Sequence, residues 1–278
     1  MKALKLDEIQ WFRLLLALHQ IIYLLKFLPN PDIWFLPGEM VIPNWTYPHV
    51  VSFVHLLSVD WQVNLVWGLL VIGWIILGTG RLSKIGQLFL FFLQVSLHNA
   101  NPLIIHEPQQ IANFFLFFSV LWPDSQSSQT KLQMKRLMLA FLCIYYFLAG
   151  LKKLPDSLWL EGKALQILLN WQPIARNNFL VEYFLKYPTL LKLATWLTLV
   201  FELGFSFIAW SRFRLWLIPI GFIFHFSINL LLEVGSFSWI MAPWYAFLLS
   251  ENKIDVVSSI QLQPKKTHLS IQNQIIQN

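Results

Sequence analysis

The chain has 278 residues, of which 56% are hydrophobic and only 12% charged, and its formal net charge is +6. Soluble domains carry about 25% charged residues, so this composition argues against a soluble globular protein and indicates that lipid is the solvent. The basic residues are scattered and form no stripe, which argues against a nucleic-acid-binding protein. The single cysteine, Cys143, lies in an apolar run and excludes an intramolecular disulfide.

The apolar segments predict an all-α protein, a polytopic membrane helix bundle of about eight transmembrane or membrane-embedded helices. A full span needs roughly 20 mostly apolar residues. The third, fifth and last segments are short, so we expect them to be tilted, re-entrant or covered by neighbours. No small-residue cleavage site follows the first segment, which is expected to remain as a transmembrane helix. In chain order the segments are Glu8–Leu28, Trp61–Thr79, Lys84–Leu97, Ile104–Trp122, Leu137–Leu151, Leu190–Trp210, Phe213–Leu232 and Phe237–Leu249.

Basic residues alternate between the two sides of this arrangement. Loops on one side hold Lys or Arg. The loops Pro29–Asp60, His98–Leu103 and Glu233–Ser236 on the other side hold none. Cytoplasmic loops carry the excess of Lys and Arg, which predicts an integral, multi-pass membrane protein with both termini in the cytoplasm. The exception is the long outer segment Lys152–Thr189, which has five basic residues. Residues 1–250 are assigned to one transmembrane domain, and the polar residues 251–278 to a cytoplasmic tail.

Two adjacent lysines, Lys152 and Lys153, end the fifth apolar segment. Neighbouring residues of an α-helix point about 100° apart, so we expect one lysine to reach the interface and the other to face the bundle. An apolar site disfavours the charged form of a lysine, and a neutral amine can act as a base or a nucleophile. The alternative is that both lysines are interface anchors.

The residues around this lysine pair predict a close helix contact before it and the end of the helix after it. Gly150 allows another helix or a ligand to approach closely, and Pro155 is expected to end the helix. Asp156 or Ser157 is the expected N-cap of a following helix. Leucines at helical spacing in Leu158–Trp171 predict an amphipathic helix on the outer face of the membrane.

From Tyr145 to Leu165 the sequence reads YYFLAGLKKLPDSLWLEGKAL. This order of an aromatic run, Ala-Gly, a lysine pair, Leu, a short spacer, Trp and Gly resembles the core motif of vitamin K-dependent γ-glutamyl carboxylase. It also resembles the wider family of horizontally transferred transmembrane domain proteins. Three further stretches are similar to that family and extend the resemblance over nearly the whole chain: LHNANPLI at Leu97–Ile104, FELGFSF at Phe201–Phe207, and FHFSINLLLEVGSFSWIMAPW at Phe224–Trp244.

The resemblance implies a quinol-dependent membrane enzyme in which Lys153 is the base that deprotonates a reduced, vitamin K-like quinone at the outer face. The carboxylase continues into a large lumenal region that binds substrate peptides. Residues 251–278 do not resemble that region, so the substrate is left unassigned. The alternative is a non-catalytic membrane scaffold, or a partner in the maturation or export of a secreted peptide, because a shared fold does not fix a function. A transporter is disfavoured, since no paired broken helices or repeat halves occur.

Polar groups at membrane depth are candidates for function because they are energetically costly there. Glu202 is expected to hydrogen-bond a neighbouring helix, to pair with a cation such as Arg13, or to carry a proton. His225 and Asn229, four residues apart, share one helix face. They are expected to hydrogen-bond another helix or to line a pocket for a quinone-like head group. Arg13 is predicted to be a structural ion-pair partner, and Lys26 an anchor at the interface.

A second polar cluster, His98, Asn99 and Asn101, lies at an outer helix end before Pro102. It is expected to cap the helix and form a turn, or to place His98 on a substrate oxygen. The spacing of the histidines supports no metal site. The candidate base is therefore Lys153, and the ligand-pocket candidates are Lys152, His98, Asn99, Asn101, Trp159, Glu202, His225 and Asn229.

Overall fold

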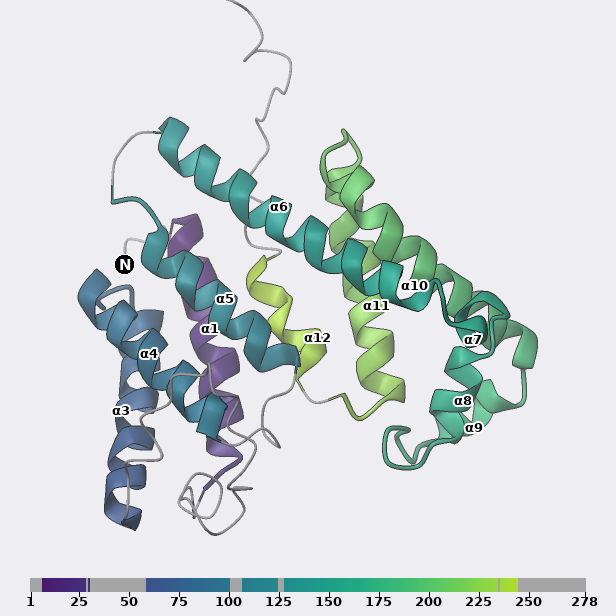
Figure 1. Ribbon diagram of the computed structural model, residues 1–278, viewed down its shortest axis with the longest axis horizontal. Coiled ribbons are helices and arrows are strands. Elements are labelled where there is room, and N and C mark those ends of the chain that lie inside the picture. Colours follow the sequence, from purple (N-terminus) through teal and green to yellow (C-terminus); the bar gives the residue numbers. More distant parts are fainter. Residues whose placement is uncertain are drawn as a thin grey trace, which may run out of the picture.

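The described part of the chain is helical apart from one isolated β-bridge between Ala175 and Leu232, which confirms the all-α class (Figure 1). The computed structural model describes residues 7–28, 30, 59–100, 107–124, 128–234 and 236–244. Its helices are α1 (Glu8–Leu25), α3 (Asp60–Gly78), α4 (Lys84–Ala100), α5 (Glu107–Leu121), α6 (Ser128–Lys153), α7 (Ser157–Leu160), α8 (Ala164–Asn170), α9 (Phe179–Leu185), α10 (Pro188–Ala209), η2 (Arg214–Trp216), α11 (Leu217–Leu231) and α12 (Phe237–Ile240).

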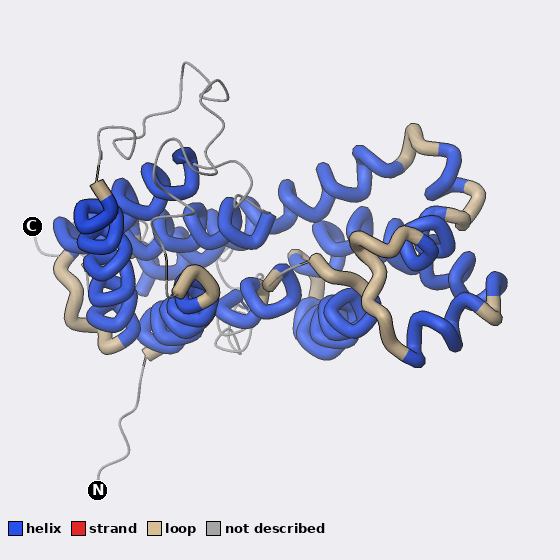
Figure 2. The backbone as a smooth tube through the Cα atoms, turned by 90° about the horizontal axis from the view of Figure 1, so that it is seen from below, coloured by secondary structure: helices blue, strands red, loops and turns tan. Residues whose placement is uncertain are grey.

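The helices form two packed groups that α6 connects (Figures 1 and 2). Helices α1, α3, α4 and α5 pack together at one end of the molecule, and α7, α8 and α9 pack against α10 at the other. Helix α6 runs from the first group to α10, and α12 contacts α1, α5 and α11. A large hydrophobic core fills the first group and extends along α6, whereas a smaller core joins α8 to α11 and contains Leu169, Val181, Leu191 and Leu232.

The local sequence explains where several helices begin. The Asp7 side chain accepts a hydrogen bond from the Gln10 backbone N–H at 2.9 Å, and the Gln10 side chain accepts one from the Asp7 N–H at 3.2 Å. This capping box satisfies two free donors at the start of α1. Pro188 lies in the first turn of α10, where its missing N–H needs no partner. Between α3 and α4 the chain turns at Gly80, whose φ of 73° favours glycine.

Within the described part of the chain, four helical stretches are long and apolar enough to cross a membrane. They are α3, the part of α6 from Gln129 to Lys153, α10, and the stretch Arg214–Leu231 that contains η2 and α11. Large apolar side chains on these helices are exposed, including Ile72 at 54% and Ile223 at 64%. Helices that are apolar on their outward faces require lipid around them. The protein is therefore an integral membrane protein with several apolar helices.

The predicted count of about eight spans is not confirmed. Helices α4 and α5 have 17 and 15 residues, fewer than the roughly 20 that a full span needs. In α1, Arg13, His19 and Gln20 reduce the mean hydropathy of an 18-residue helix. The last predicted segment is described as helical mainly over Phe237–Ile240. Within the described residues, the helices that are long and apolar enough to cross a bilayer alone are therefore the four named above.

The fifth predicted segment is longer than its apolar run. Helix α6 has 26 residues, and its first turns take up basic residues that were expected in a loop. One of them, Lys135, forms an ion pair with Glu8, which ties the start of α6 to α1. The cytoplasmic orientation of the termini rests on the charge distribution and stays a prediction. The division into residues 1–250 and 251–278 also stays a prediction, because the tail lies outside the described residues.

The predicted amphipathic helix at Leu158–Trp171 is instead two short helices, α7 and α8. Between them Gly162 adopts a φ of 76°, which ends α7, and a Cβ atom there would meet the side chain of Lys192. The break places Glu161 in an exposed position, where it pairs with Lys163 at 2.6 Å. The hydrogen bond from Lys163 lowers the pKa of the Glu161 carboxyl.

Candidate functional site

The second lysine of the pair faces the helix bundle. The Lys153 ammonium lies 2.7 Å from both carboxylate oxygens of Glu202 in α10, and it also donates to the Ala149 carbonyl at 3.4 Å. The Lys152 side chain is exposed. The prediction that the two lysines point in different directions is confirmed, and the inward position belongs to Lys153.

The Glu202 carboxylate reaches the lysine because α6 and α10 approach closely at Gly150. A Cβ atom on Gly150 would lie 2.9 Å from Leu203 Cγ and 3.2 Å from Glu202 Cβ, so only glycine fits without a shift of its neighbours. The Ser206 hydroxyl donates to the Cys143 carbonyl at 2.8 Å and links the same two helices a second time. The close approach predicted at Gly150 is confirmed, and its partner is α10.

Trp159 of α7 completes the surroundings of the amine. Helix α6 ends at Lys153, ahead of Pro155, and Asp156 caps α7 by accepting a hydrogen bond from the Leu158 N–H at 2.9 Å. Both predictions about this turn are therefore confirmed. The turn brings the Trp159 ring to Lys153, with 5.2 Å between the nitrogen and the ring centroid. An aromatic face at this distance attracts a cation.

The surroundings of Lys153 are charged rather than apolar, which corrects one premise of the sequence interpretation. The Lys153 side chain is 23% exposed and the Glu202 side chain 9%. Glu202 is therefore the ion-pair partner of Lys153.

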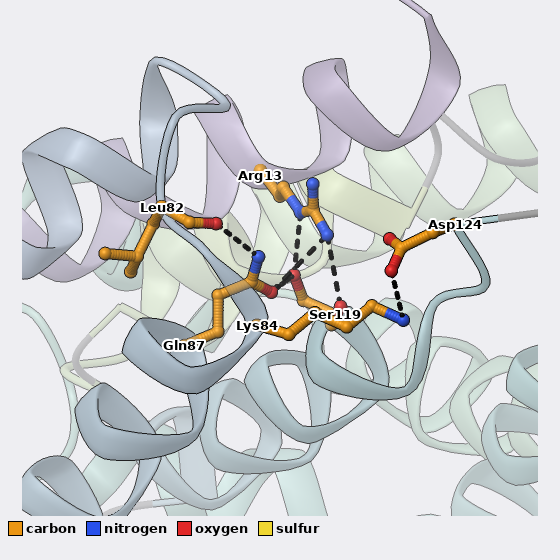
Figure 3. Close-up of polar contacts among 6 residues, drawn as sticks. All are labelled: Arg13, Leu82, Lys84, Gln87, Ser119 and Asp124. Carbon is orange, nitrogen blue, oxygen red and sulfur yellow. Dashed lines mark hydrogen bonds and ion pairs between the residues drawn. The ribbon is translucent and has the colours of Figure 1, made fainter.

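Glu202 pairs with a cation, as predicted, but that cation is Lys153 and not Arg13. Arg13 projects from α1 toward α4 and α5, where it donates to the Ser119 hydroxyl at 2.9 Å and the Ser119 carbonyl at 3.1 Å (Figure 3). It also donates to the Gln87 side chain at 3.4 Å. Within the described residues Arg13 forms no ion pair, so hydrogen bonds to neutral groups hold it between three helices. The Lys26 side chain is exposed, as expected for an anchor.

Tyr146 was not singled out from the sequence, yet it is buried in the core, on the same helix as Lys153. Its hydroxyl is 2.6 Å from His225 Nε2 in α11, which confirms the predicted interhelical hydrogen bond of that histidine, and its ring stacks on Phe205 at 4.2 Å. The buried His225 Nδ1 has no hydrogen-bond partner in the described part of the chain. Tyr146, Gly150 and Lys153 follow the spacing of one helix face, and this spacing could have identified the tyrosine.

His98 is buried in the last turn of α4. Its ring lies edge-on to Tyr23 at 6.0 Å, and its side chain hydrogen-bonds Asn113. Asn99 is half-buried, and Asn101 lies outside the described residues, so the turn expected there stays a prediction. Over the described ranges, no three His, Cys, Asp or Glu residues are grouped in a way that could hold a metal ion.

Two adjoining cavities border the other candidates. One of about 500 Å³ is lined by Asn229 and by residues of α1 and α12. The second, of about 50 Å³, is lined by His225 and Asn229. Neither cavity is lined by Lys153, Glu202 or Trp159. The structure thus brings these last three residues together in one cluster. His225 and Asn229 lie apart from that cluster, at the cavities.

Comparison with known proteins places most of these residues in one matched region. A family model described as the HTTM domain matches residues 110–252. No curated protein and no solved structure matches the chain. The matched region contains Lys153, Trp159, Glu202, His225 and Asn229, whereas His98 precedes it.

Proposed function

Because the chain belongs to the HTTM domain family, whose domain is found in the membrane region of vitamin K-dependent carboxylases, we propose that it is a membrane enzyme. In this proposal Lys153 is the base that removes a proton from a weakly acidic hydroxyl at the outer face. The observation that carries the proposal is the contact between the Lys153 amine and both oxygens of Glu202 at 2.7 Å.

The ion pair gives Lys153 a way to become a base. Transfer of one proton from the ammonium to the carboxylate leaves a neutral amine beside a neutral carboxylic acid. This state removes two charges from a poorly solvated site, which lowers the desolvation cost that opposes it. The neutral amine would then accept the proton of a bound hydroxyl. Glu202 would keep the first proton, and the Lys153 ammonium would offset the negative charge left on the ligand, so the net charge of the site would not change.

A reduced quinone fits the chemistry of this cluster. Such a cofactor would supply an acidic hydroxyl on an aromatic ring. Lys153 provides the proton acceptor, and Trp159 provides an aromatic face at 5.2 Å from the amine. With 23% of its side chain exposed, Lys153 remains reachable by a ligand in the bilayer.

A non-catalytic scaffold is the second candidate function, and one observation favours it. Lys153 already satisfies both oxygens of Glu202, and the pair joins two helices that pack tightly at Gly150. A structural link between α6 and α10 would need no further role. The protein would then act as a membrane partner in the maturation or export of a secreted peptide.

The experiment that separates the two functions is thermal unfolding of the purified protein in detergent with reduced menaquinone. A ligand at 100 times its Kd stabilises the folded state by about 2.7 kcal/mol. We expect this stabilisation in the wild type and in Lys152→Met, the matched control on the exposed neighbour, and we expect its loss in Lys153→Met. If the quinol stabilises none of these proteins and Lys153→Met supports normal function in cells, the scaffold is the better assignment.

A further inference from the structure

The cavity of about 500 Å³ follows the side of α1. This side of the cavity is formed by Leu15, Leu18 and Ile22 of α1 and by Lys26, which caps the end of the helix. The four residues recur every three or four positions. From first to last these positions span roughly 16 Å of helix. The volume falls within the range of about 300–1,000 Å³ that is typical of sites for small molecules.

The wall of this cavity combines an exposed apolar stripe with cations. The Leu18 and Ile22 side chains are 48% and 62% exposed, so the cavity opens on the outward, apolar face of α1. Lys26 and Arg176 line the same cavity. An occupant that matches this wall has a long apolar part and an anionic group.

Polar side chains that line the cavity carry N–H groups that can donate hydrogen bonds to an occupant. The Arg176 Nε donates to the Leu232 carbonyl at 3.3 Å, which leaves the other N–H groups of the guanidinium, and its Nη1 lies 3.7 Å from the exposed Glu233 carboxylate. The Lys26 ammonium and the Asn229 amide have no hydrogen-bond partner within the described residues. None of the described lining residues is acidic. The cavity can therefore supply several hydrogen bonds to one anion.

We propose that this cavity binds an anionic phospholipid, with one acyl chain along the apolar stripe of α1 and the phosphate against Arg176 and Lys26. Charge complementarity argues for this occupant, because two cations and an amide donor outweigh the single nearby carboxylate of Glu233. The open apolar side lets the second acyl chain remain in the bilayer. The site is separate from the proton-transfer pair, because neither Lys153 nor Glu202 lines the cavity.

Binding is measured on the delipidated full-length protein in detergent by native mass spectrometry. The probes are phosphatidylglycerol and phosphatidylcholine with identical acyl chains. We expect phosphatidylglycerol to bind more tightly, and Arg176→Gln and Lys26→Gln each to weaken it about five-fold with little effect on phosphatidylcholine. The matched control is Lys186→Gln, an exposed lysine that does not line the cavity. It is expected to change neither affinity.

A variant that gains affinity makes the test independent of folding defects. Glu233→Gln removes the carboxylate beside Arg176 and is expected to strengthen phosphatidylglycerol binding. Equal affinity for the two lipids, or an equal loss in Lys186→Gln, would overturn the proposal. Competition by inorganic phosphate or by oleate at the same concentration would also overturn it, because the site would then belong to a free anion or a fatty acid.

Discussion

Replacement of Lys153 by Met would leave the Glu202 carboxylate without the ammonium that lies 2.7 Å from both of its oxygens. The Glu202 side chain is only 9% exposed, so water cannot replace the lost partner. Removal of one member of a buried pair costs about 3–5 kcal/mol. Each kcal/mol shifts the Tm of a chain of about 150–250 residues by roughly 2–4 °C. We therefore expect Lys153→Met to lower the Tm by roughly 6–20 °C.

Replacement of Glu202 is expected to cost less stability than replacement of Lys153. After Glu202→Leu, the 23% exposed Lys153 side chain can turn toward the interface, so the loss is about 1–3 kcal/mol. The double variant should recover most of the loss, because an apolar replacement of a buried ion pair is often neutral. Unfolding of the wild type, the two single variants and the double variant in detergent gives a double-mutant cycle. The surface control Lys152→Met is expected to change the free energy of unfolding by less than about 0.5 kcal/mol. Additive losses would refute the idea that the two residues act as one energetic unit.

Two further predictions use the same unfolding measurement. Gly150→Ala inserts a methyl group at the contact with α10. Overpacking costs about 1–3 kcal/mol and exceeds the helix-propensity gain of about 1 kcal/mol, so we expect this variant to be less stable than the wild type. The control is Gly204→Ala, where the added methyl group meets open space, and it is expected to raise stability by up to about 1 kcal/mol. An equal gain in Gly150→Ala would contradict the close approach of α6 and α10. Tyr146→Phe removes the hydroxyl 2.6 Å from His225 Nε2 and is expected to lower stability by about 1–3 kcal/mol, since a buried ring nitrogen loses its partner. An unchanged Tm would show that the hydrogen bond contributes nothing.

The features that the sequence predicted correctly arise from short stretches of chain. The angle between consecutive helical residues predicted that Lys152 and Lys153 diverge. Proline sterics predicted the end of α6, and a short acidic side chain predicted the cap of α7. The small volume of Gly150 predicted a close helix contact. Each of these properties depends on neighbours within one or two turns.

The partners of the buried polar groups could not be read in the same way. Lys153 and Glu202 are 49 residues apart, and Tyr146 and His225 are 79 apart. The sequence offered Arg13 as a cation for Glu202 because both lie in apolar runs. Which cation reaches the carboxylate depends on which helices pack together, and no local pattern carries that information.

Composition by itself determined that this protein is a helical membrane protein, because a chain with 12% charged residues cannot cover a surface in water. The motif around Lys153 and Trp159 determined the family. Only the tertiary structure decided that α6 packs on α10 and so pairs Lys153 with Glu202. It also decided that α1, α11 and α12 leave a cavity with a cationic wall. Hydrophobic burial selects which residues avoid water, but the packing of helices distant in sequence selects which polar groups meet.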